Sequence, residues 1–141
     1  MNYETSQAAP GGEAAARHNS SFITLNSPTD LRDRTKSFAL RIVKMFTALP
    51  KTAEAQVLGK QALRSGTSVG AQYREGKRAK SDADLVSKLE GALQELEESE
   101  YWLELLEEAA VFSNSRLQPL LAETPELISI FVTVVKNIKD R

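Results

Sequence analysis

The chain has 141 residues, a formal net charge of −1 at pH 7 and 41% hydrophobic residues, values that suit a single soluble globular domain. It contains no cysteine, which excludes disulfides and thiolate metal ligands. No apolar run approaches the roughly 20 residues of a bilayer span, and the N-terminus lacks the apolar segment of a signal peptide. We therefore expect a cytoplasmic protein without a membrane partner.

The small net charge hides a strong asymmetry along the chain. Residues 31–80 carry twelve Lys or Arg and three acids, a balance of +9, whereas residues 81–113 carry one Lys and ten acids, a balance of −9. A basic surface of this kind permits an anionic partner. The alternative is that the two segments lie side by side, within or between subunits, and neutralise each other.

The N-terminal residues 1–26 are rich in Ala, Gly, Ser and Asn and predict a disordered tail, which holds the sole histidine, His18. Residues 27–141 are predicted to form the folded domain. The first helix begins with Ser27 as N-cap and Pro28 in the first helical position, and Pro50 ends it. Its apolar face has helical spacing: Leu31, Thr35, Phe38, Ile42, Met45, Phe46 and Leu49.

The second helix is predicted from about Thr52 to Arg78 and contains the stretch QALRSGTSVGAQYREG. At 100° per residue, Gly59, Gly66 and Gly70 share one strip. Each glycine costs up to about 1 kcal/mol in a helix, so we expect Gly66 and Gly70 to admit a closely packed helix. A separate polar stripe forms either core, interface or ligand surface: Gln61, Ser65, Ser68, Gln72 and Glu75.

The third helix follows a second capping residue, Ser81, and is predicted to reach about Phe112. Its buried positions have the spacing of a coiled-coil seam: Leu85, Leu89, Ala92, Leu96, Ser99, Leu103, Leu106 and Ala110. The last helix is predicted from Arg116 to about Lys139, with Pro125 either restarting or kinking it. Its stripe is Leu127, Phe131, Val134 and Ile138. Four helices joined by short turns predict an all-α, antiparallel up-and-down four-helix bundle.

The sequence offers little support for an enzyme. Nucleophilic catalysis by serine needs a base, and the only histidine lies in the predicted tail. There is no Glu-x-x-His pair for a di-iron site and no phosphate-binding loop. We therefore expect no catalytic residue, cofactor or metal ligand. The alternative function is a Mg²⁺-dependent all-α nucleotide pyrophosphohydrolase, with Glu75 and a run of glutamates on the third helix as metal ligands: Glu97, Glu98, Glu100, Glu104, Glu107 and Glu108.

Binding of RNA or DNA is the other functional class that the charges indicate. Lys and Arg clusters on the first two helices can neutralise phosphates without reading sequence. The predicted nucleic-acid-binding residues are Arg32, Arg34, Lys36, Arg41, Lys44, Arg74, Lys77, Arg78 and Lys80. The acidic third helix and a pI near 5.9 set the whole protein apart from strongly basic nonspecific binders.

Three segments in this order, LRDRTKSFALRIV, QALRSGTSVGAQYREGKRAKS and KLEGALQELEESEYWLELLEEA, resemble a known family. It comprises the four-helix-bundle proteins encoded in 23S rRNA intervening sequences and the accessory variability proteins of diversity-generating retroelements. The resemblance covers residues 30–139. It implies an antiparallel bundle that assembles into a homopentameric ring and has no established enzymatic activity.

The resemblance also implies partners. Retroelement members bind nucleic acid and a reverse transcriptase through a basic outer surface, so both are the partners that the resemblance suggests for this chain. We expect Arg64 to pair with a glutamate of the third helix near Tyr101, and Trp102 to anchor an interface or the core. The predicted function is that of a non-enzymatic, ring-forming scaffold or accessory protein that binds nucleic acid through the basic surfaces of its first two helices.

Overall fold

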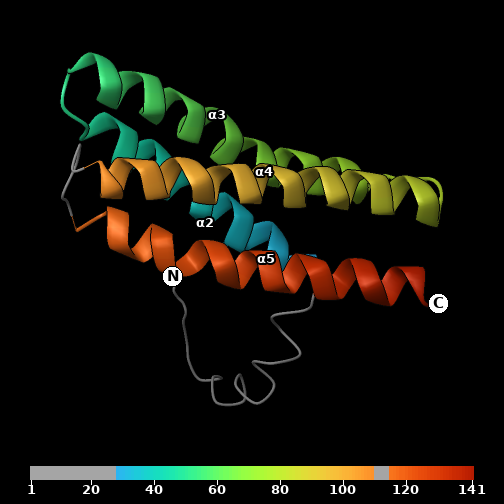
Figure 1. The fold of residues 1–141 in the computed structure, drawn as a ribbon. Coiled ribbons are helices and arrows are strands. Elements are labelled where there is room, and N and C mark those ends of the chain that lie inside the picture. Colours follow the sequence, from blue (N-terminus) through green and yellow to red (C-terminus); the bar gives the residue numbers. More distant parts are fainter. Residues whose placement is uncertain (1–27, 110–114) are drawn as a thin grey trace, which may run out of the picture. The chain divides into compact units, whose positions relative to one another are not determined.

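The computed structural model describes residues 28–109 and 115–141, and these residues are helical apart from the turns that join the helices. The helices are α2 (Pro28–Thr47), α3 (Ala53–Gly76), α4 (Asp82–Glu108) and α5 (Leu117–Lys139) (Figure 1). The all-α prediction is therefore confirmed. The chain divides into two compact units, residues 1–33 and 34–141, and the packing below is that of the second. The predicted tail with His18, and the predicted cap Ser27, lie outside the described residues.

Capping residues begin α3 and α4, and the second of them, Ser81, is the one predicted from the sequence. The Thr52 hydroxyl accepts a hydrogen bond from the Ala55 N–H at 3.3 Å, and the Ser81 hydroxyl accepts one from the Asp84 N–H at 3.1 Å. Each cap satisfies an N–H that the helix itself cannot pair, and such caps contribute about 1 kcal/mol. The N-terminal starts of these two helices therefore follow from local hydrogen bonds.

Consecutive helices run antiparallel, because their facing residues pair in opposite order along the chain. Gly59 faces Leu49 and Gly70 faces Thr35 between α3 and α2; Ser65 faces Ser99 and Glu75 faces Lys88 between α3 and α4; Glu107 faces Gln118 and Glu90 faces Lys139 between α4 and α5. Figure 1 shows α3 and α4 side by side along their lengths. The packing is that of a four-helix bundle, as predicted.

An aliphatic core fills the bundle. Its largest fully buried side chains in residues 34–141 are Phe38, Ile42, Met45, Leu89, Leu96, Leu103, Leu106, Leu117, Leu120, Leu127 and Phe131. The edge of the Tyr73 ring packs on Phe131, with ring centroids 6.2 Å apart, and joins α3 to α5. On α4 the predicted stripe is buried from Leu89 to Leu106, so the heptad spacing had identified the core-facing side correctly.

The last helix is continuous from Leu117 to Lys139 and includes Pro125, which excludes a restart at that residue. Because proline has no N–H, the Leu121 carbonyl lacks its usual helical donor. In length and composition, α5 is apolar enough to cross a membrane, with a mean hydropathy of 1.2, as core helices of soluble proteins also can be. Here Leu127 and Phe131 on α5 are fully buried in the bundle.

Candidate nucleic-acid interface

The glycine strip of α3 lies against α2. A Cβ atom on Gly66 would lie 2.8 Å from Cγ1 of Ile42, and one on Gly70 would lie 3.1 Å from Oγ1 of Thr35. A Cβ atom on Gly59 would meet Leu49 and would lie 3.0 Å from the Phe46 ring. These short distances show that α3 packs closely on α2, so this face of α3 is a helix-packing surface.

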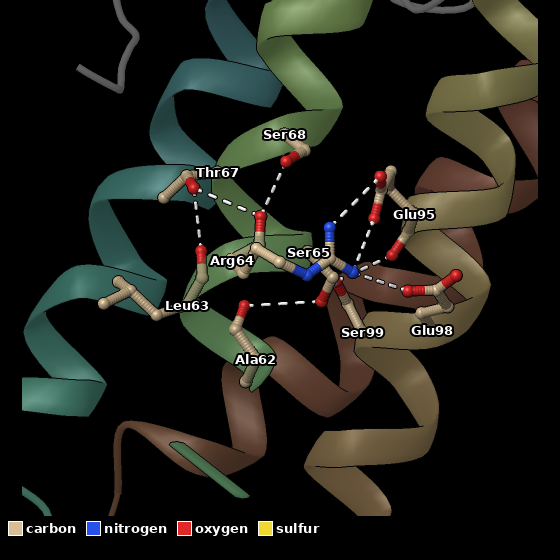
Figure 2. A network of polar contacts seen from close by, with 9 residues as sticks. All are labelled: Ala62, Leu63, Arg64, Ser65, Thr67, Ser68, Glu95, Glu98 and Ser99. Carbon is tan, nitrogen blue, oxygen red and sulfur yellow. Dashed lines mark hydrogen bonds and ion pairs between the residues drawn. The ribbon is translucent and has the colours of Figure 1, made fainter. Parts of the chain in front are cut away.

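The polar stripe of α3 lies along the seam with α4. Ser65 and Ser99 are both fully buried, and their hydroxyl oxygens are 2.8 Å apart (Figure 2). Because Ser99 donates to the Glu95 carbonyl at 2.8 Å, Ser65 is the donor to Ser99. About two turns further along α3, Gln72 fills the space that a side chain at Gly91 would need. Ser65, Gln72 and Glu75 of the stripe therefore meet α4 of the same chain, whereas Gln61 is exposed and Ser68 donates to the Arg64 carbonyl of its own helix.

An arginine closes this seam on its solvent side. The Arg64 guanidinium donates to Glu95 at 3.2 Å and to Glu98 at 2.7 Å (Figure 2). The hydrogen bond to Glu95, followed by the charge of that carboxylate, raises the pKa of Arg64 above its ordinary value. The partners are glutamates of the third helix, one and two turns before Trp102. Arg64 with Glu95 and Glu98, and Glu75 with Lys88, are ion pairs that join the +9 segment to the −9 segment.

The half-buried Trp102 contacts the ring of Tyr101, with centroids 5.0 Å apart. Its indole N–H is buried and has no hydrogen-bond partner among the described residues. Tyr101 itself is 54% exposed. Both rings belong to α4, and the anchoring of an interface or the core by Trp102 stays a prediction.

The predicted cations of α2 fall into different environments. Arg34 is mostly buried and binds Glu123 through two nitrogens, at 2.8 Å for the shortest contact, with a further contact to Glu126 at 3.3 Å. This ion pair holds α2 to α5 and withdraws Arg34 from the candidate surface. Arg32 is exposed and belongs to the first unit. The other predicted cations are exposed and form no ion pair with a described residue: Lys36, Arg41 and Lys44.

The predicted cations at the end of α3 remain available. All are exposed, and none forms an ion pair with a described residue: Arg74, Lys77, Arg78 and Lys80. An open groove between α3 and α4 is lined by Ala71, Arg74, Glu75, Arg78 and Lys88. Lys88 is absent from the predicted set because it is the one Lys in a segment that otherwise carries ten acids. Only the pairing of α3 with α4 brings it beside the arginines.

The glutamates of α4 do not form a metal site with described residues. Within residues 28–109 and 115–141, no three acidic or histidine side chains converge as metal ligands. Glu98 is engaged by Arg64 and Glu107 by Gln118. The Mg²⁺-dependent alternative therefore gains no support from the geometry of the described residues.

Residues 29–133 match the model of the family described as 23S rRNA-intervening sequence protein. The chain belongs to this family. The match extends through all four helices, so the resemblance predicted from the sequence is confirmed.

A solved structure supports the same assignment. It is a protein with unknown function from the S23 ribosomal protein family of Bacteroides thetaiotaomicron, 36% identical to this chain. The similarity covers 77% of this chain and 97% of that one, with a TM-score of 0.71. No match is found among curated proteins.

Proposed function

We propose that this protein is a non-enzymatic helical-bundle scaffold or accessory protein that binds the phosphate backbone of nucleic acids. The observation that carries the proposal is the set of exposed cations on α2 and α3 without an ion pair to any described residue: Lys36, Arg41, Lys44, Arg74, Lys77, Arg78 and Lys80. Cations that have no internal partner remain free to replace the counterions of a polyanion.

The contrast with the paired cations supports this assignment. Arg34 and Arg64 each hold carboxylates of a neighbouring helix and stabilise the bundle. The unpaired set has no such structural role. Contacts to phosphates orient a protein on nucleic acid without reading its bases, and none of the described cations is placed in a base-reading motif. We therefore expect binding that depends strongly on salt and weakly on sequence.

Assembly into a homo-oligomeric ring is the second part of the proposal. Large apolar side chains remain exposed on every described helix: Leu40, Val43, Val57, Tyr101 and Val132. Burial of such side chains between subunits stabilises an assembly. A ring would repeat the basic surface, so that weak phosphate contacts add through avidity. Light scattering on the purified chain measures the assembly directly, and a monomer at micromolar concentration would refute the ring.

Retention of labelled RNA and DNA over a series of salt concentrations tests nucleic-acid binding. The triple variant Arg74→Gln, Lys77→Gln, Arg78→Gln should reduce the slope of log affinity against log salt by about 2 to 3, since each lost phosphate contact contributes about 0.7–0.9. A matched control replaces three other exposed lysines by Gln: Lys51, Lys60 and Lys136. This control should reduce the salt slope less than the triple variant does. Absence of salt-sensitive binding by the wild-type protein would refute this function.

A further inference from the structure

The groove at the end of α3 contains a carboxylate among three cations. Arg74, Arg78 and Lys88 line it together with Glu75. The Lys88 ammonium lies 3.2 Å from Oε1 of Glu75, and the two side chains are 40% and 58% exposed. An ion pair this exposed opens at little cost. The groove is therefore a candidate anion site in which one cation is already occupied.

The backbone holds the two arginines on one side of the chain. Beyond Gly76, the Lys77 N–H donates to the Tyr73 carbonyl at 3.1 Å and the Arg78 N–H to the Glu75 carbonyl at 3.0 Å. The chain thus keeps a helical course for one more turn, and residues four apart lie above one another. Guanidinium groups present several N–H donors that suit phosphate oxygens, so Arg74 and Arg78 can approach the same backbone phosphate.

We propose that Glu75 is a built-in competitor of the nucleic-acid phosphate in this groove. Its carboxylate repels the phosphate and competes with it for the Lys88 ammonium, so the wild-type groove binds mainly through its two arginines. This inference rests on the proposed function and adds to it a residue that limits affinity. A limited affinity keeps each contact reversible, which suits a protein that binds through several repeated surfaces.

The variant Glu75→Gln isolates this effect. The amide keeps the size of the side chain but removes the charge, which frees Lys88 for the phosphate. At about 0.15 M salt we expect affinity for a labelled RNA or DNA oligonucleotide to rise about three- to tenfold, the effect of removing one unit charge several ångströms from a phosphate in a solvent-exposed site. The salt slope should steepen by about 0.7–0.9, one additional phosphate contact. The double variant Glu75→Gln, Lys88→Gln should return the slope to the wild-type value.

A control variant separates this local effect from the loss of one negative charge. Glu104 is exposed on α4 and follows Lys88 by sixteen residues, about 24 Å at 1.5 Å per residue, well beyond the screening length. Glu104→Gln should change affinity less than twofold. An equal rise in both variants would overturn the proposal, because the effect would then come from net charge.

The remaining outcomes distinguish this inference from the proposed function. If Glu75→Gln binds like wild type while the triple variant at Arg74, Lys77 and Arg78 weakens binding, the competitor is refuted and nucleic-acid binding stands. If the Glu75 variant binds and wild type does not, nucleic-acid binding by the native protein is refuted, and with it the competitor, which requires that the wild-type groove binds through its arginines. If neither protein binds RNA or DNA, both proposals are overturned.

Discussion

The glycine strip of α3 makes a quantitative prediction for Gly66→Ala. In an exposed helix this substitution would stabilise the protein by about 1 kcal/mol, because alanine has the higher helix propensity. Here the new Cβ would lie 2.8 Å from Cγ1 of Ile42 and 3.2 Å from its Cδ1 and Cγ2. Ile42 is fully buried, and its branched side chain has few alternative rotamers in a helix. The neighbour therefore cannot move aside without a shift of the backbone.

Two opposing terms decide whether Gly66→Ala stabilises or destabilises the protein. Overpacking of a close-packed core costs about 1–3 kcal/mol, and the tightness of this contact favours the upper half of that range. After subtraction of the propensity gain, Gly66→Ala should destabilise the bundle by about 1–2 kcal/mol. Gly70→Ala, whose Cβ would lie 3.1 Å from Oγ1 of Thr35 and 3.4 Å from its Cβ, should cost less.

Urea denaturation at a fixed protein concentration measures these changes as a shift of the midpoint at constant slope. Combining Gly66→Ala with Ile42→Ala tests the contact itself. Ile42→Ala alone should cost about 2–5 kcal/mol. The double variant should be more stable than the two losses predict by about 1–2 kcal/mol, because the new methyl group occupies part of the cavity. A Gly66→Ala protein more stable than wild type would refute close packing of α3 on α2 at this residue.

Two further predictions concern polar contacts on α4. Ser99→Ala should lower the free energy of unfolding by about 1–2 kcal/mol, because the buried Ser65 hydroxyl would retain only a 3.4 Å contact to the Ala62 carbonyl. Ser65→Ala should cost less, because Ser99 would still donate to the Glu95 carbonyl at 2.8 Å. Equal losses of stability on urea denaturation would contradict the assigned donor direction. The hydrogen bond from Arg141 lowers the pKa of Asp82. A lowered folded-state pKa means that its contribution to stability is present above the unfolded value of about 3.9 and is lost as pH falls through the folded value. In Arg141→Gln, an NMR titration should therefore find the Asp82 carboxyl at a higher pKa, and an unchanged value would contradict the ion pair.

The sequence by itself determined the four helices and the starts of α3 and α4. Thr52 and Ser81 mark the starts of α3 and α4 because capping acts over three residues of the same chain. The heptad spacing identified the buried side of α4 from Leu89 to Leu106, because helical periodicity is a local property. Short connections then favour antiparallel neighbours, and the family could be identified from motifs in those same helices.

Only the tertiary structure decided which face of each helix meets which neighbour. The sequence separated a glycine strip from a polar stripe on α3, but the rotation of the helix in the bundle placed the first on α2 and the second on α4. The register of α3 against α4 brought Lys88 beside Glu75, and the packing of α2 paired Arg34 with Glu123, 89 residues away. Such pairs depend on helix rotation and axial offset, which the packing of the whole core determines.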